Sequence, residues 1–240
     1  MEYKLKSNVT DFRNRFGYNS TEPINYCSLL QRLDILTLFK PLSENFSGLS
    51  IKNEENRFML VNCNHTLGRQ NFTIGHELFH LYYDQTFIPH KCNTGLFPKK
   101  DVNEYKADIF ASHLLLPEDG IMQLIPDEEL AKDQIKLATL LKIEQTYGSS
   151  RAALLTQLEK MNLISRTFRS SHLNTIKTSA RQYGYSSELY ETTPEKTILG
   201  TYGTLANKLY EKDQISEGHY LELMLAIGVD VNEIVNNEED

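Results

Sequence analysis

The spacing of apolar residues predicts one helix and two short strands in the first quarter of the chain. Four leucines recur at helical intervals over residues 26–39, and Pro41 then stops the pattern. Residues 46–51 and 57–62 are short apolar runs on either side of a polar turn, and they predict a strand pair. Gly48 lies inside the first run, where a glycine marks a bulge or a close backbone approach.

The rest of the chain is predicted to be mainly helical, so the expected fold class is α+β with a small sheet. Residues 163–187 form the least regular part, and we place a boundary near residue 165 between domains over 1–165 and 166–240. A loop with two prolines and a glycine is expected over 84–100. Helical patterns cover residues 71–83, 101–115, 127–133, 134–146, 149–162, 196–211 and 216–227.

Composition argues against several classes of protein. The formal net charge of −7 argues against a general affinity for nucleic acid or anionic membranes. The three cysteines are widely spaced and form no CxxC pair, which favours reduced thiols over a disulfide framework. Because neither a signal-peptide pattern nor an apolar run of membrane-spanning length occurs, we expect a cytoplasmic protein.

The decisive segment is His76-Glu77-Leu78-Phe79-His80. Two histidines four apart on a helix share one face, so both imidazoles can reach one ion at about 2.0–2.1 Å. Glu77 follows the first histidine, where it can accept a proton from water without binding the metal. The simpler alternative is a helix with two surface histidines and a solvated glutamate.

A catalytic zinc site needs a third protein ligand and one open position. Glu104 is the preferred candidate because it lies on the next predicted helix, whereas His90 and Cys92 lie in the loop. Asp108 is four residues after Glu104 and shares its face, so it could accept the second ring N–H of His76. This order of residues is that of gluzincin metallopeptidases. Zn²⁺, one per chain, is the expected metal, although Mn²⁺ accepts the same ligands.

Stabilising the oxyanion of peptide hydrolysis requires a further hydrogen-bond donor. The sequence does not rank the available side chains, each of which more often serves packing or lies at the surface. The candidates are His90, His113, Tyr82, Tyr83 and Tyr105.

Three segments in order resemble the ImmA/IrrE family of metallopeptidases. Residues 69–81 resemble its HExxH helix, and residues 104–117 resemble its helix with the third ligand. Residues 149–164 resemble a helix-turn-helix-like segment that often follows, so the resemblance covers about residues 25–165. Asp108 departs from the family pattern, because asparagine is frequent there.

The resemblance implies a gluzincin-like core followed by helix-turn-helix-like helices near 127–164 and a C-terminal helical region. It also implies cleavage of one partner protein, such as a helix-turn-helix transcriptional repressor or an antitoxin of a phage or mobile element, under stress. One alternative is a metal-stabilised sensor or binding module that regulates a partner without proteolysis. Another is a DNA-binding regulator with a vestigial site, which the acidic net charge disfavours.

A basic stretch over residues 160–187 contrasts with the acidic whole, since it contains no Asp or Glu. We interpret this stretch either as a solvated connector or as a surface that contacts DNA or an acidic partner. Its basic residues are Lys160, Arg166, Arg169, Lys177 and Arg181.

Overall fold

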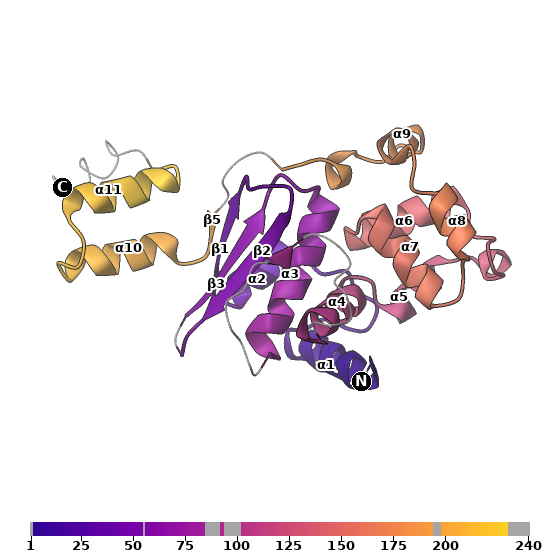
Figure 1. Cartoon of the computed structure of the whole chain (residues 1–240), viewed down its shortest axis with the longest axis horizontal. Coiled ribbons are helices and arrows are strands. Elements are labelled where there is room, and N and C mark those ends of the chain that lie inside the picture. Colours follow the sequence, from indigo (N-terminus) through magenta and orange to yellow (C-terminus); the bar gives the residue numbers. More distant parts are fainter. Residues whose placement is uncertain (1, 55, 85–91, 94–101, 194–197, 230–240) are drawn as a thin grey trace.

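The computed structural model describes residues 2–54, 56–84, 92–93, 102–193 and 198–229. A mixed sheet with strand order β4-β2-β3-β1-β5 lies at the centre of the molecule (Figure 1). The strands β1 and β3 run parallel, and the other pairs run antiparallel. The strands are β1 (Ile35–Lys40), β2 (Phe46–Lys52), β3 (Arg57–Asn62), β4 (Cys92–Asn93) and β5 (Ile198–Leu199).

The helix predicted over residues 26–39 is wrong in its second half. Helix α2 (Tyr26–Arg32) ends early, Asp34 takes a left-handed φ of 49°, and β1 follows at once. Within β1 the burial alternates, with Thr37 and Phe39 inward, which is the period of a strand. The leucine spacing continued across this junction by coincidence, because a helical and an alternating pattern share several positions.

The predicted strand pair is confirmed, since β2 and β3 form an antiparallel hairpin. The register of β2 against β4 shifts between Phe46 and Gly48, which is the irregularity that Gly48 indicated. Gly48 is also a close approach, because a Cβ there would lie 2.6 Å from Cγ2 of Thr73. The sheet therefore packs tightly on the helix that carries Thr73.

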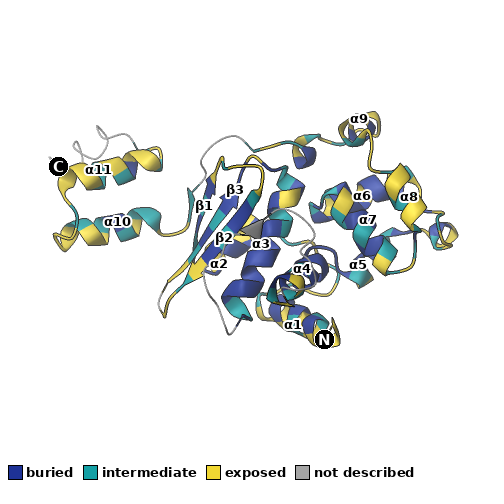
Figure 2. Cartoon of the chain, viewed as in Figure 1, coloured by how far each residue is buried: buried dark blue, intermediate teal, exposed yellow. Residues whose placement is uncertain are grey.

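On one side of the sheet, three helices pack one after another: α3 (Leu67–Tyr82) against the strands, then α4 (Val102–Leu115), then α1 (Glu2–Arg15) (Figure 1). The predicted helices over 71–83 and 101–115 correspond to α3 and α4, and α3 begins four residues early. Gly75 allows close packing of α3 on α4, since its Cβ would lie 3.3 Å from Cα of Ala111. Dark blue, buried positions concentrate where these helices meet the sheet (Figure 2).

A group of short helices follows α4 in the chain (Figure 1). The helix predicted over 127–133 is wrong, because only one 3₁₀ turn, η1, forms there. The helices near 134–146 and 149–162 are confirmed as α6 and α7, joined through Gly148 with a φ of 61°. These elements are α5 (Glu118–Leu124), η1 (Asp127–Glu129), α6 (Leu137–Tyr147), α7 (Arg151–Lys160), α8 (Arg166–Ser171), α9 (Ile176–Gln182) and η2 (Glu188–Tyr190).

The C-terminal region contributes β5 to the sheet and then a hairpin of α10 (Tyr202–Glu211) and α11 (Glu217–Ala226) (Figure 1). The helices predicted over 196–211 and 216–227 therefore form, the first of them shorter at its N-terminal end. The division at residue 165 stays a prediction. Within the described ranges, no helix is both long and apolar enough to cross a membrane.

The basic stretch over 160–187 is partly neutralised by acidic residues outside it. Arg169 pairs with Glu159 at 2.6 Å, and both Lys177 and Arg181 lie within 3.9 Å of Glu191. These pairs bind the short helices α8 and α9 to their neighbours, in keeping with the connector alternative.

Gly68 gives a test of the packing between α3 and the helices that follow α4. A Cβ at Gly68 would lie 2.7 Å from the backbone nitrogen of Ser150, so backbone would have to move. We expect Gly68→Ala to lower the free energy of unfolding by about 1–3 kcal/mol in urea titrations. Gly218→Ala is the control, because nothing lies within 4 Å of a Cβ there. Equal stabilities of the two variants would contradict this packing.

Candidate metal centre

Three buried side chains meet where α3 crosses α4. The two Nε2 atoms of His76 and His80 lie 3.2 Å apart. Glu104 on α4 places Oε2 3.2 Å from Nε2 of His76 and Oε1 3.1 Å from Nε2 of His80. All three side chains are at most 3% exposed. The structure thus brings together the three residues that the sequence nominated as ligands.

The chemistry of these atoms fits a small divalent cation. The Nδ1 atoms of both histidines face carboxylates, which accept only, so each Nδ1 donates and each neutral ring leaves a lone pair on Nε2. Two Nε2 lone pairs and a carboxylate then converge on one point. In a tetrahedral site with bonds of about 2.0–2.1 Å, the ligand atoms lie about 3.3 Å apart. The observed 3.1–3.2 Å is close to that value, so this group could hold a metal ion.

Two aspartates orient the histidine rings. Oδ1 of Asp108 lies 2.9 Å from Nδ1 of His76, as the helical spacing predicted. Oδ2 of Asp84 lies 3.1 Å from Nδ1 of His80, and Asn103 donates to its other oxygen at 3.3 Å. The sequence reading missed Asp84. The i,i+4 spacing from His80 could have indicated this contact. It was not used, because residue 84 was assigned to the predicted loop.

Lys52 holds the end of α3 that carries His80. Its Nζ donates to the backbone oxygens of His80, Leu81 and Asp84 at 3.0, 2.9 and 3.1 Å. A cation at the C-terminal end of a helix satisfies carbonyls that the helix leaves open and complements its dipole. Burial lowers the pKa of this lysine, and the charge of Asp84 opposes that effect. The sequence reading did not single out Lys52.

Glu77 follows His76 on α3 and is buried, but it is not one of the three candidate ligands. Its Oε2 accepts a hydrogen bond of 2.7 Å from Oγ of Ser50, a residue on β2. Its Oε1 is buried, and no hydrogen-bond partner for it occurs among the residues that the structure describes. A glutamate with one oxygen bonded and the other without a partner could accept a proton. No sequence pattern pointed to Ser50, because the contact joins residues 27 apart.

Two tyrosines proposed as oxyanion donors are engaged in packing. The hydroxyl of Tyr83 donates to the backbone oxygen of Asn8 on α1 at 3.0 Å. The ring of Tyr82 lies between Phe12 and the guanidinium of Arg57. Tyr105 is 39% exposed on α4. His90, together with the side chain of Cys92, lies outside the described residues.

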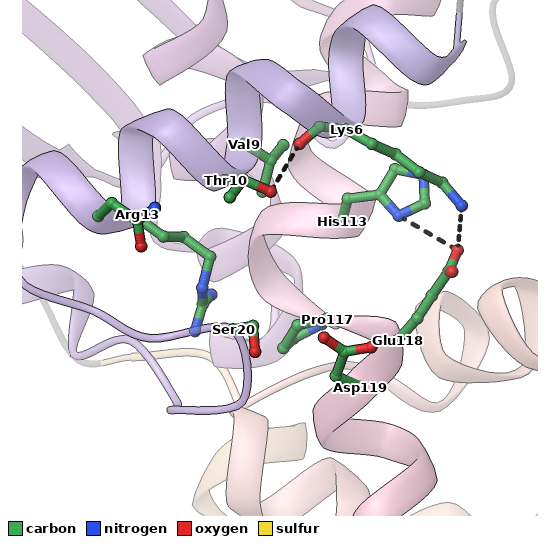
Figure 3. A pocket seen from close by; sticks show the side chains of 10 residues that line it. Lys6, Val9, Thr10, Arg13, Ser20, His113, Pro117, Glu118 and Asp119 are labelled. Carbon is green, nitrogen blue, oxygen red and sulfur yellow. Dashed lines mark hydrogen bonds and ion pairs between the residues drawn. The ribbon is translucent and has the colours of Figure 1, made fainter.

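His113, another oxyanion candidate, belongs to a different site. It borders a pocket of about 190 Å³ between α1 and the start of α5. Figure 3 shows its ring turned toward Glu118, which also binds Lys6 at 2.7 Å. Its Nδ1 is also 3.4 Å from Nε2 of Gln157. Burial lowers the pKa of His113, and the nearby Lys6 adds to that effect. The contacts of His113 therefore anchor α4 to its neighbours.

A helix with an HExxH segment, covered by a mixed sheet on one side and by a glutamate-bearing helix on the other, defines a metallopeptidase. Residues 30–159 match the model of the family described as Peptidase_M78, IrrE N-terminal-like domain. This match covers 130 of the 240 residues, so the chain belongs to that family, and the resemblance to ImmA/IrrE metallopeptidases is confirmed. A comparison with curated proteins gave no match.

Asp84 allows a direct test of the geometry around His80. Replacing Asp84 by Asn keeps the shape but weakens the acceptor of the Nδ1 proton. We expect Asp84→Asn to lower the affinity for Zn²⁺ by about 10- to 100-fold in competition with a chromophoric chelator. Asp119→Asn, which changes an exposed carboxylate on α5, should leave the affinity unchanged. Equal affinities of the two variants would contradict a role for Asp84 at His80.

Proposed function

We propose that this protein is a zinc-dependent endopeptidase that cleaves one specific partner protein. The observation that carries this proposal is the buried Oε1 of Glu77, which has no hydrogen-bond partner among the described residues. Glu77 directly follows His76 of the candidate cluster His76, His80 and Glu104. Membership of a metallopeptidase family supports the reaction class. The imidazole and carboxylate donors favour zinc among the available divalent metals, and Mn²⁺ remains the second choice.

In this mechanism His76, His80 and Glu104 hold the metal, and Asp108 and Asp84 keep the histidine rings in the ligating tautomer. A zinc ion held there supplies a Lewis acid that polarises the scissile carbonyl and makes water more acidic. Oε1 of Glu77 takes the proton of the attacking water. Glu77 then gives that proton to the amine that leaves, so the base returns to its carboxylate form.

The alternative is a metal-stabilised sensor or binding module that acts by contact alone. A structural metal site needs no general base, because its ligands close the coordination sphere. An open carboxylate oxygen in a buried setting is costly to maintain, since a buried acceptor without a partner loses about 1–3 kcal/mol. Glu77 has that cost here, which favours the hydrolase.

The substrate that we propose is a helix-turn-helix transcriptional regulator or antitoxin, encoded by a phage or mobile element. Support comes from the resemblance to ImmA/IrrE proteins, which implies a single regulatory target. The place of action that we propose is the cytoplasm, where such regulators bind DNA. The chain's own helix-turn-helix-like pair, α6 and α7, buries Leu154, Leu155 and Leu158 and thus serves packing.

Metal content tests the three ligands. We expect about one zinc per chain in the wild type by mass spectrometry, and loss of zinc in both His80→Ala and Glu104→Ala, because two ligands do not retain the ion. Glu128→Ala, at an exposed glutamate in η1, serves as the control. Zinc retained in Glu104→Ala would move the third ligand to Asp108, His90 or Cys92. No metal in the wild type would favour the binding module.

Glu77→Gln separates metal binding from catalysis, since glutamine keeps the shape and cannot accept the proton. We expect this variant to retain zinc and to lose proteolysis by at least about 100-fold. The measurement is mass spectrometry of new protein N-termini in cells that express either form together with candidate regulators. One regulator should show a new N-terminus only with the wild type. Equal cleavage by both forms would exclude Glu77 as the base.

A further inference from the structure

One face of β2 packs against helix α3 along the length of the strand. Gly48, Ser50 and Lys52 occupy alternate positions of the strand and therefore point to the same side. Gly48 abuts Thr73 and Glu77, Ser50 binds Glu77, and Lys52 binds the carbonyls at the end of α3. The hairpin pairing with β3 runs from Gly48 to Lys52, so this face is held by regular backbone hydrogen bonds.

The contact of Ser50 with Glu77 is short and buried. Ser50 is 2% exposed, and its Oγ lies 2.7 Å from Oε2, a distance typical of a hydroxyl that donates to an ionised carboxylate. A hydroxyl carries one proton, and Ser50 gives it to this bond. Serine is a poor strand former, and burial of its hydroxyl is unfavourable without such a partner. The bond to Glu77 accounts for a serine at this position.

The contact makes the two oxygens of Glu77 unequal. Oε2 is engaged by Ser50, whereas Oε1 has no hydrogen-bond partner in the described part of the chain. Gly48 keeps the space beside Oε1 open, because a Cβ there would lie 3.1 Å from that oxygen. The terminal torsion of a glutamate is broad, so nothing within the side chain itself fixes the plane of the carboxylate.

We propose that Ser50 is a positioning residue that fixes the carboxylate rotation of Glu77 and thereby assigns Oε1 as the proton-accepting atom. This inference rests on the proposed function and adds a residue to it. Without the Ser50 hydroxyl, the plane of the carboxylate is free to rotate, and an open carboxylate oxygen faces the proton donor only part of the time. Ser50 itself touches neither the metal nor the substrate.

Acetohydroxamic acid is a suitable probe, because its binding needs no known substrate. As it binds zinc, its O–H bond breaks, the anion coordinates the metal, and the proton passes to a nearby base, here Oε1 of Glu77. The wild type and each variant are loaded with zinc, and the affinity is measured by calorimetry. Zinc content and melting temperature are measured on the same samples.

We expect Ser50→Ala to keep its zinc and to bind acetohydroxamic acid about tenfold more weakly, as loss of a hydrogen bond to a charged group predicts. Ser50→Cys retains the size and a weak donor, so its affinity should fall between those of Ser50→Ala and the wild type. Ser47→Ala is the matched control, since Ser47 is a buried serine of the same strand that does not bind the carboxylate of Glu77. Its affinity should equal that of the wild type.

A double-mutant cycle distinguishes positioning from general stability. If Ser50 acts through Glu77, adding Ser50→Ala to Glu77→Gln should change the affinity by less than about twofold. An unchanged affinity in Ser50→Ala, or the full loss in the Glu77→Gln background, would overturn the role of Ser50 alone. A wild type that holds no zinc, or that binds the probe no better than Glu77→Gln, would overturn the proposed function together with this inference.

Discussion

The close crossing of α3 and α4 is the constraint on which the centre depends. Gly75 lets the two helices approach, because a side chain there would press on the backbone of Ala111. At this separation Glu104 on α4 reaches both His76 and His80 on α3. Lone pairs concentrated in a buried space repel one another, so a cation held between them would stabilise the crossing. Fold and metal affinity are therefore coupled.

Sequence reasoning found the candidate residue pairs that share one face of a predicted helix. The pairs His76–His80 and Glu104–Asp108 both follow from a spacing of four, and their helices were predicted nearly in full. It did not find the contact between the sheet and α3. Ser50 contacts Glu77 only because β2 packs on α3, and no sequence pattern within either segment indicates that contact.

The wrong or missing predictions of secondary structure each have a local physical cause. The leucines of residues 26–39 fit a helix, and only the left-handed turn at Asp34 shows that the period changes. Helix α1 was not predicted, although Leu5, Val9 and Phe12 have helical spacing and are buried. Its many polar residues obscured that stripe, because three apolar positions in fourteen give little contrast.

Four carboxylates gather around the centre, and their partners separate their roles. Glu104 faces two Nε2 lone pairs and is suited to a metal, whereas Asp84 and Asp108 each face an Nδ1 proton and are suited to orient a ring. Glu77 faces a serine hydroxyl with one oxygen and keeps the other open. Since all four groups are chemically alike, the role to which each is suited depends on the group that the fold places against it. The small sheet supplies the hydroxyl that binds Glu77, so it contributes a contact at the candidate site as well as packing.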